Sequence, residues 1–105
     1  MERIAVLIAS SPTSPSAGRA FQLIRDLSAE GHSVTLCLLE DGVYAAGARA
    51  SAYPLDRCAA VLVLEGDLDL RGVRRDALHE SCRPCSYAGM VDVMMEQADR
   101  TLGAF

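Results

Sequence analysis

Residues 4–9 read Ile-Ala-Val-Leu-Ile-Ala, a short unbroken apolar run that stops at a loop rich in serine and proline, residues 10–16. A run of this length bounded by a loop is typical of a strand buried in a parallel sheet. The next stretch, residues 17–30, spaces its apolar side chains at helical intervals. We expect Ser16 to cap this helix and Gly31 to end it in the left-handed conformation.

The same alternation of short apolar runs and helical patterns continues to the end of the chain. Further strands are expected at residues 33–39, 60–64, 82–87 and 102–105. Helices or short helical turns are expected at residues 43–53, 67–80 (interrupted at Gly72) and 88–101. Pro84 restricts the strand that contains it to a sheet edge. The sequence therefore predicts an α/β three-layer sandwich, with a mainly parallel sheet of four or five strands and helices on both faces.

Length and charge narrow the classes of function. The chain has 105 residues, so residues 1–105 are expected to form a single α/β domain. Acidic residues outnumber basic ones by 14 to 10, and the net charge of −4 argues against direct binding of nucleic acid. The first apolar run is too short for a secretory signal or a membrane span. We expect a cytoplasmic protein that makes no membrane contact.

The carboxyl ends of parallel strands are where such sheets gather ligands and reactive groups. Because the predicted strands are parallel, Glu65 and the segment Glu40-Asp-Gly-Val-Tyr44 come to this edge. Gly42 allows a sharp turn after the strand, and Asp41 is expected to cap the helix that follows. The alternative is that Asp41 and Tyr44 line a pocket, and both readings can hold together.

The loop at residues 10–16 stands where a phosphate cradle would precede a helix. It lacks the glycines of a dinucleotide fingerprint and the lysine of a P-loop, and its two prolines remove backbone donors. We interpret it as a connecting loop and expect no cofactor. A small ligand, such as a flavin, bound through this loop is a further hypothesis.

The four cysteines are expected to be reduced thiols in a cytoplasmic protein. Cys37 lies inside an apolar strand and is expected to be buried, and Cys58 falls at the sheet edge opposite the expected site. Cys82 and Cys85, in Cys-Arg-Pro-Cys, allow three chemistries. These are a redox pair, a zinc site and a single reactive thiol.

The surroundings of Cys82 and Cys85 argue against two of these chemistries. A redox pair needs its first thiol at a helix start, whereas this pair precedes a predicted strand. Zinc needs four ligands, and only His79 joins the two cysteines, so no metal site is expected. In an extended segment the two thiols point to opposite faces. Cys85 would then reach the carboxyl edge beside Arg83, and the positive charge of Arg83 would favour the Cys85 thiolate. Incidental roles for both cysteines remain the alternative.

Three stretches of this sequence resemble, in order, the DsrE/DsrF/DsrH and TusB/TusC/TusD sulfur-relay family. They are residues 30–46 (Glu-Gly-His-Ser-Val-Thr-Leu-Cys-Leu-Leu-Glu-Asp-Gly-Val-Tyr-Ala-Ala), residues 61–73 and residues 86–102. The last stretch is most similar to the DsrH/TusB branch. The resemblance implies a small α/β sandwich that assembles into trimers or hexamers. It also implies partner relay proteins that pass persulfide sulfur between cysteine thiols, for tRNA thiolation or sulfur oxidation.

The chain departs from the resembling family at its thiols. The family places a cysteine near the end of the third strand or in the first helix, and residues 64–67 and 17–30 contain none. The sequence therefore predicts a sulfur carrier or sulfurtransferase subunit with a relocated thiol, or a subunit that scaffolds such a carrier. The expected site consists of the candidate thiols Cys85 and Cys82 and the pocket residues Asp41, Gly42, Tyr44, Glu65 and Arg83.

The alternative function is a non-catalytic subunit that uses the same edge only for assembly with its partners. The missing family thiols favour it. Met90, Met94 and Met95 are expected to line the buried face of the last helix, and a methionine stripe would also suit a subunit interface.

Overall fold

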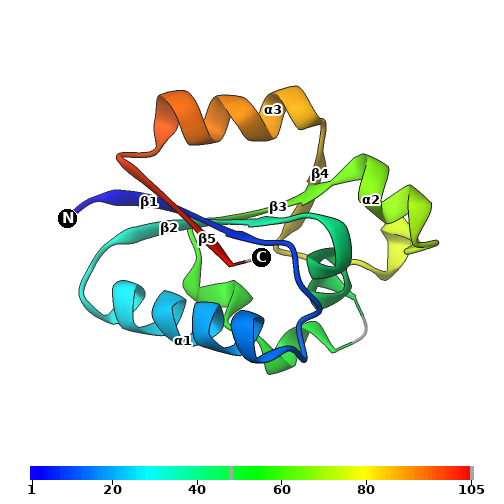
Figure 1. Cartoon of the computed structure of the whole chain (residues 1–105), viewed down its shortest axis with the longest axis horizontal. Coiled ribbons are helices and arrows are strands. Elements are labelled where there is room, and N and C mark those ends of the chain that lie inside the picture. The colour runs from blue at the N-terminus through cyan, green and yellow to red at the C-terminus, as the bar shows by residue number, and fades with distance from the viewer. Residues whose placement is uncertain (48, 105) are drawn as a thin grey trace.

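The computed structural model describes residues 1–47 and 49–104 and contains a parallel five-stranded sheet (Figure 1). The strands are β1 (Arg3–Ile8), β2 (Ser33–Leu38), β3 (Ala60–Leu64), β4 (Cys82–Cys85) and β5 (Arg100–Ala104). They lie side by side in the order β4-β3-β2-β1-β5, and every neighbouring pair is parallel. The predicted α/β fold is confirmed, and Pro84 lies in an edge strand as expected.

Helices cover both faces of the sheet (Figure 1). Helix α1 (Pro15–Ala29) lies on one face and α3 (Tyr87–Asp92) on the other. The side chain of Ser14 caps α1 by accepting a hydrogen bond from the Ala17 N–H, so the predicted cap at Ser16 is wrong. Pro15 explains the earlier start, because proline fits the first helical position. Gly31 follows α1 with φ 88°, as expected.

The connection from β2 to β3 is not the predicted helix over residues 43–53. It forms three short 3₁₀ turns at Glu40–Ala46, Ala50–Ala52 and Leu55–Arg57, and Ala48 lies outside the described residues. Gly47 and Pro54 interrupt a continuous helix. The small alanine side chains let the turns pack closely against the sheet, where Ala45 and Ala46 are fully buried.

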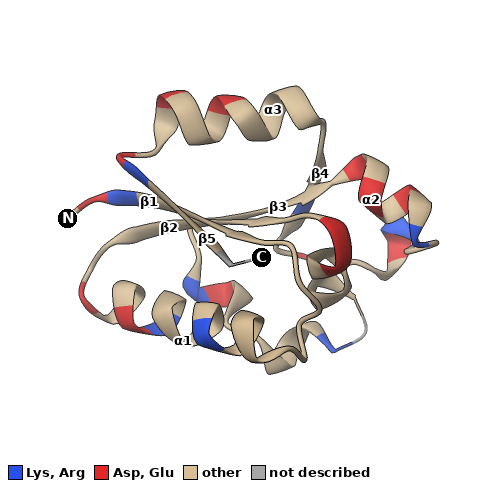
Figure 2. Cartoon of the chain, in the orientation of Figure 1, with Lys and Arg blue, Asp and Glu red and all other residues tan. Residues whose placement is uncertain are grey.

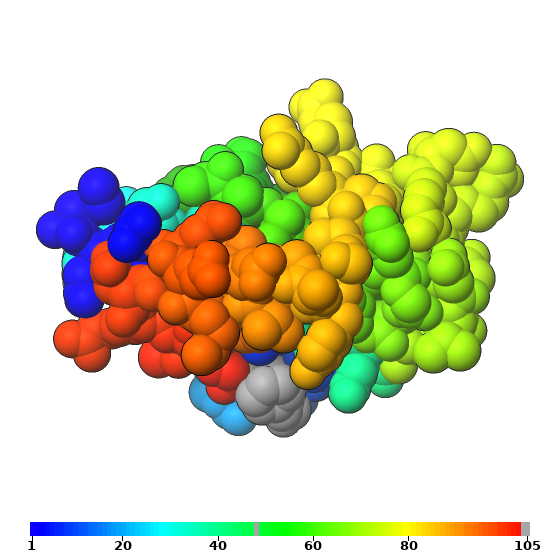
Figure 3. Space-filling view, turned by 90° about the horizontal axis from the view of Figure 1, so that it is seen from above, coloured from blue at the N-terminus to red at the C-terminus, as the bar shows by residue number. Residues whose placement is uncertain are grey.

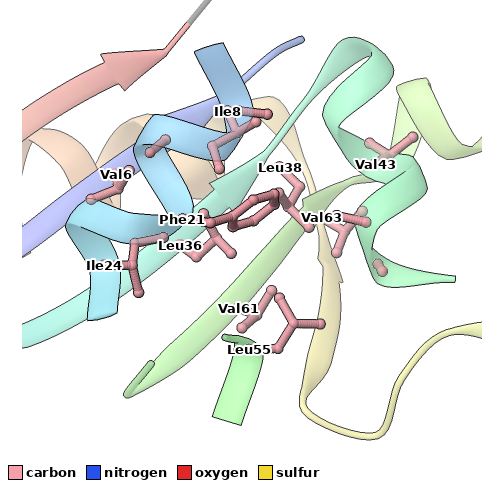
Figure 4. Close-up of a cluster of buried hydrophobic side chains, with 14 of the residues drawn as sticks. Val6, Ile8, Phe21, Ile24, Leu36, Leu38, Val43, Leu55, Val61 and Val63 are labelled. Carbon is pink, nitrogen blue, oxygen red and sulfur yellow. The ribbon is translucent and has the colours of Figure 1, made fainter. Parts of the chain in front are cut away.

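The thicker part of the core lies between the sheet, α1 and these turns. Phe21 of α1 stacks on Tyr53, with ring centroids 4.7 Å apart. Figure 4 shows the aliphatic side chains that surround Phe21 in this layer. The labelled members are Val6, Ile8, Ile24, Leu36, Leu38, Val43, Leu55, Val61 and Val63. Removing this apolar surface from water is the main source of stability.

The layer under α3 is thinner. Its fully or nearly fully buried members are Ala5, Leu7, Cys37 and Met90. Leu62, Leu64, Cys85 and Met94 pack against them and stay partly exposed. Helix α3 continues into one π-helical turn, Val93–Gln97, and crosses the sheet from β4 to β5 (Figure 1).

The last helix is shorter than the predicted residues 88–101, because Ala98 is already extended and β5 begins at Arg100. Met90 and Met94 face the sheet as expected, whereas Met95 is 78% exposed. Met95 lies one residue beyond the i, i+4 pair and therefore turns away from the sheet. The prediction that Met95 is buried is wrong.

The connection from β3 to β4 confirms the predicted short turns. Helix α2 (Glu65–Leu70) comes first, and a 3₁₀ turn follows at Arg75–Ala77. Gly72 separates the two with φ 65°. Because glycine adopts this conformation without steric cost, the helix can stop there and the chain can turn back towards β4.

Candidate functional site

Cys85 lies at the edge formed by the carboxyl ends of the strands. It is the last residue of β4 and pairs with Leu64, the last residue of β3. Ser86 follows it and caps α3 by accepting a hydrogen bond of 3.0 Å from the Gly89 N–H. A Cβ atom placed on Gly89 would lie 4.0 Å from the Cys85 Cβ. The first turn of α3 therefore packs beside this residue. Figure 3 views the molecule from the face on which α3, in orange, lies.

Cys82 and Cys85 point to opposite faces of the sheet. Cys82 packs against the core on the α1 side, and Cys85 packs against the thinner core under α3. All four cysteines are free thiols. The expected separation of the pair is confirmed, and this geometry does not suit a redox disulfide between them.

The four thiols differ in how strongly the protein suppresses their ionisation. Burial raises the pKa of Cys37 and of Cys58 to about 12 and the pKa of Cys82 to about 11. Partial burial, and then the negative charge of Glu65, raise the pKa of Cys85. Cys85 is the least buried of the four and the one that lies at the carboxyl edge.

The expectation that Arg83 favours a Cys85 thiolate is wrong. Arg83 lies on the exposed edge strand, and its side chain is open to water. The charge that acts on Cys85 is instead that of Glu65, the first residue of α2. In the isolated chain the thiol is therefore held in its protonated form at neutral pH.

We expect Glu65→Gln to increase the rate at which iodoacetamide alkylates Cys85 at pH 7.5 by about two- to fivefold, because removal of a nearby negative charge lowers the thiol pKa. The control is Asp69→Asn, which removes an exposed carboxylate from the same helix. Mass spectrometry of the Cys85 peptide over time measures the rate. An equal acceleration in both variants would mean that Glu65 has no specific effect on this thiol.

Asp41 belongs to an ion network and does not cap a helix. Arg71 Nε donates to Asp41 Oδ1 at 2.9 Å, and its Nη1 donates to Asp67 Oδ1 at 3.1 Å. Asp67 Oδ2 accepts the backbone N–H of Glu40 at 2.7 Å. Glu40 has φ 49°, which is unfavourable for a residue with a side chain. The network thus ties the strained turn after β2 to α2, and it corrects the predicted capping role of Asp41.

Gly42 and Tyr44 occupy two different environments on the same turn. Gly42 is buried, and a Cβ at this position would lie 2.0 Å from the carbonyl oxygen of Ile8. Tyr44 is 47% exposed and borders a groove on the α1 side of the edge. Gly42 is therefore required by close packing, and Tyr44 faces away from the thiol layer.

The structure brings together only part of the predicted site. Cys85 and Glu65 are neighbours on the α3 side, while Asp41 is bound to Arg71. Figure 2 shows that the acidic residues of α2 and of the turn after β2 lie at the same end of the sheet. Sequence reasoning missed the central role of Arg71. Its i, i+4 spacing from Asp67 on a helical turn was the available signal.

Comparisons with known proteins give a family match and two similar folds. The family model described as "DsrH like protein" matches residues 13–100 of the chain. The chain is similar to the YchN protein from E. coli, with a TM-score of 0.83 and 18% identity, covering 98% of this chain and 99% of that one. It is also similar to a protein of unknown function, MTH1491, from Methanobacterium thermoautotrophicum, with a TM-score of 0.78 and 14% identity. That match covers 95% of this chain and 97% of the other.

No curated protein matches this chain. At identities of 18% and 14%, the similarity shows that this chain shares the fold of the two solved structures. Among the described residues, no helix has the length and apolar character needed to cross a bilayer. No three histidine, cysteine, aspartate or glutamate side chains of the described ranges are grouped so that they could hold a metal ion.

Proposed function

The chain belongs to the DsrH-like protein family, and from this membership we propose that it is a sulfur-relay protein in which Cys85 accepts sulfur from a persulfide donor. The position of Cys85 is the observation that supports this proposal most strongly. The thiol lies at the carboxyl edge of a parallel sheet, where α/β proteins gather their reactive groups.

The other three cysteines are less suited to this role. Cys37 is fully buried in the middle of the sheet. Cys58 precedes β3 and Cys82 begins β4, so both lie at the amino ends of the strands. Their thiols are also more deeply buried than that of Cys85. A donor that reaches the carboxyl edge would therefore meet Cys85 first.

The chemical step is an attack by the Cys85 thiolate on the terminal sulfur of the donor persulfide. A new S–S bond forms between Cys85 Sγ and that sulfur, and the S–S bond of the donor breaks. The donor leaves as a thiolate and takes up the proton that Cys85 released. Cys85 then carries the persulfide, and the next thiol in the relay removes the sulfur by the same exchange. No external oxidant or reductant is consumed.

A partner would assist ionisation of the thiol. Because Glu65 and partial burial raise the pKa of Cys85, a cation brought close to Glu65 by a docked protein would lower that pKa again. Sulfur transfer would then be faster in the complex than in the isolated chain. Exposed Arg83, two residues before Cys85 on the same strand, would bind an acidic group of that partner.

The partners in this proposal are other sulfur-relay proteins and further copies of the same chain. The α3 layer is thin, and large apolar side chains on α3 and on the turn that follows it remain open to water. Tyr87 is 72% exposed and Met95 78%. We propose that a trimer or hexamer covers part of this surface, and that the protein works in the cytoplasm, where thiols stay reduced.

Intact-mass spectrometry after incubation with glutathione persulfide tests whether the protein accepts sulfur on Cys85. Wild type is expected to gain about 32 mass units for one added sulfur, and Cys85→Ser is expected to lose this gain. Cys82→Ser is the matched control, because it makes the same change on the same strand but on the other face. An unchanged gain in Cys85→Ser would contradict the proposed acceptor.

The raised pKa of all four thiols favours a second candidate, a non-catalytic assembly subunit. In that case wild type would take up no sulfur from the donor, either alone or with its relay partners. It would still form an oligomer by light scattering. Sulfur uptake that depends on Cys85 would rule this candidate out.

A further inference from the structure

A groove of about 610 Å³ lies at the carboxyl edge, on the α1 side of the sheet. Three segments form it: the loop after β1, the 3₁₀ turns after β2, and the connection after α2. Its walls include Ser11, Thr13, Tyr44, Tyr53 and Val73. The volume falls within the range of about 300–1,000 Å³ that is usual for sites of small organic molecules.

The walls of this groove are mostly apolar and aromatic. Tyr53 is held in place by its stack on Phe21, at 4.7 Å between ring centroids and 21° between ring planes. Val73 packs against the same core and lines the groove. A fixed aromatic ring and the half-exposed ring of Tyr44, which both line the groove, suit a flat, aromatic ligand body.

The only charged side chains among the described residues that line the groove are Arg49 and Arg74, in a chain with a net charge of −4. Arg74 donates to Asp76 at 2.5 Å, but both side chains are exposed, and such pairs are weak in water. The hydroxyls of Ser11 and Thr13 lie 3.1 Å apart at the same rim. The polar groups of the groove therefore favour a negatively charged ligand.

We propose that this groove binds a small organic anion with an aromatic body. The tyrosine rings and Val73 would contact the aromatic part, and Arg49 and Arg74 would bind the anionic group. The inference does not rest on sulfur transfer, because the groove lies on the α1 side and Cys85 packs on the α3 side. Failure of either proposal therefore leaves the other intact.

Two fluorescent probes that share an aromatic body test the proposal. One is 8-anilinonaphthalene-1-sulfonate, which is an anion, and the other is N-phenyl-1-naphthylamine, which is neutral. We expect saturable binding of the anion at one site. Its dissociation constant should rise about tenfold or more in the double variant Arg49→Ala/Arg74→Ala, because hydrogen bonds to a charged group are lost. Binding of the neutral probe should change little.

The matched control is Arg19→Ala/Arg57→Ala, which removes two exposed arginines that do not line the groove. This control has the same net charge as the groove variant, and it should bind the anion as tightly as wild type does. Thermal melts by circular dichroism verify that each variant is folded. If the alanine variant unfolds, Arg49→Gln/Arg74→Gln replaces it.

The location of the probe completes the test. Amide chemical shifts in the NMR spectrum should move at Ser11, Tyr44 and Val73 when the anion is added. The substitution Ala77→Phe, which fills the groove, should weaken the binding of both probes. The proposal would be overturned if the groove variant and the control lost affinity for the anion equally. It would also be overturned by chemical-shift changes confined to Tyr87 and Met95 on the α3 side, or by the absence of saturable anion binding.

Discussion

Replacing Gly42 with alanine is expected to lower the free energy of unfolding by about 3 kcal/mol or more, the upper part of the range for overpacked sites. The added Cβ would lie 2.0 Å from the Ile8 carbonyl oxygen and 2.9 Å from its carbon. These are backbone atoms, and the Ile8 oxygen also accepts the Leu39 N–H at 3.1 Å. The clash therefore cannot be relieved by rotating a flexible side chain, and the ends of β1 and β2 must shift.

Urea unfolding monitored by circular dichroism measures this loss, with Gly18→Ala as the control. Gly18 lies in α1, and a Cβ there would meet no atom within 4 Å. That substitution is expected to stabilise the protein by about 0.5–1 kcal/mol, because alanine favours a helix over glycine. Similar stabilities for Gly42→Ala and wild type would show that the turn does not pack as described.

Raising the pH from 9 to 12 is expected to remove about 3 kcal/mol of stability through Cys37 alone. Its pKa is about 12 in the folded chain, against an ordinary value of 9.0, because the side chain is fully buried in the sheet. Folding therefore favours the protonated thiol. The contribution is fully present below pH 9 and is lost as the pH rises towards the folded pKa.

Urea midpoints measured between pH 8 and pH 11 test this expectation. For wild type, stability should fall above pH 9 with a slope that includes about 1.4 kcal/mol per pH unit from Cys37. Cys37→Ala should be less stable near neutral pH, because it leaves a small cavity, but should lose stability more slowly above pH 9. Cys58 and Cys82 titrate in the same direction, so part of the slope remains. Equal slopes in the two proteins would contradict the effect of Cys37.

The sheet was predictable because its determinants are local. The three central strands β1, β2 and β3 are short, mostly apolar runs bounded by a loop or a turn, and the predicted 60–64 matches β3 (Ala60–Leu64) to the residue. Pro84 marked β4 as an edge strand, since proline cannot donate a hydrogen bond to a second neighbour. The opposite directions of Cys82 and Cys85 follow from the two-residue period of a strand.

The errors arose where distant segments decide the structure. Alanine-rich residues 43–53 favour a helix on their own, but packing of Gly42 against Ile8 and the interruptions at Gly47 and Pro54 give 3₁₀ turns instead. Asp41 has the composition of a helix cap, and Arg71, thirty residues away, binds it. The nearest charge to Cys85 in the sequence is Arg83, whereas the fold supplies Glu65.

The uneven covering of the sheet connects the fold with the proposed relay. The α1 side has a deep core, while the α3 side leaves Leu62, Leu64 and Cys85 partly exposed beneath one short helix. Such a thin layer suits a thiol that must stay protected from water and still be reached by a partner protein. The same exposure explains why a partner would change the reactivity of Cys85.

Locating the transferred sulfur shows whether Cys85 is the acceptor. Wild type is treated with glutathione persulfide, its thiols and persulfides are alkylated with iodoacetamide, and tandem mass spectrometry of its peptides identifies the residue that carries the additional sulfur. We expect this residue to be Cys85. Additional sulfur on Cys82 or Cys58 with none on Cys85, or on no cysteine of the chain, would contradict it.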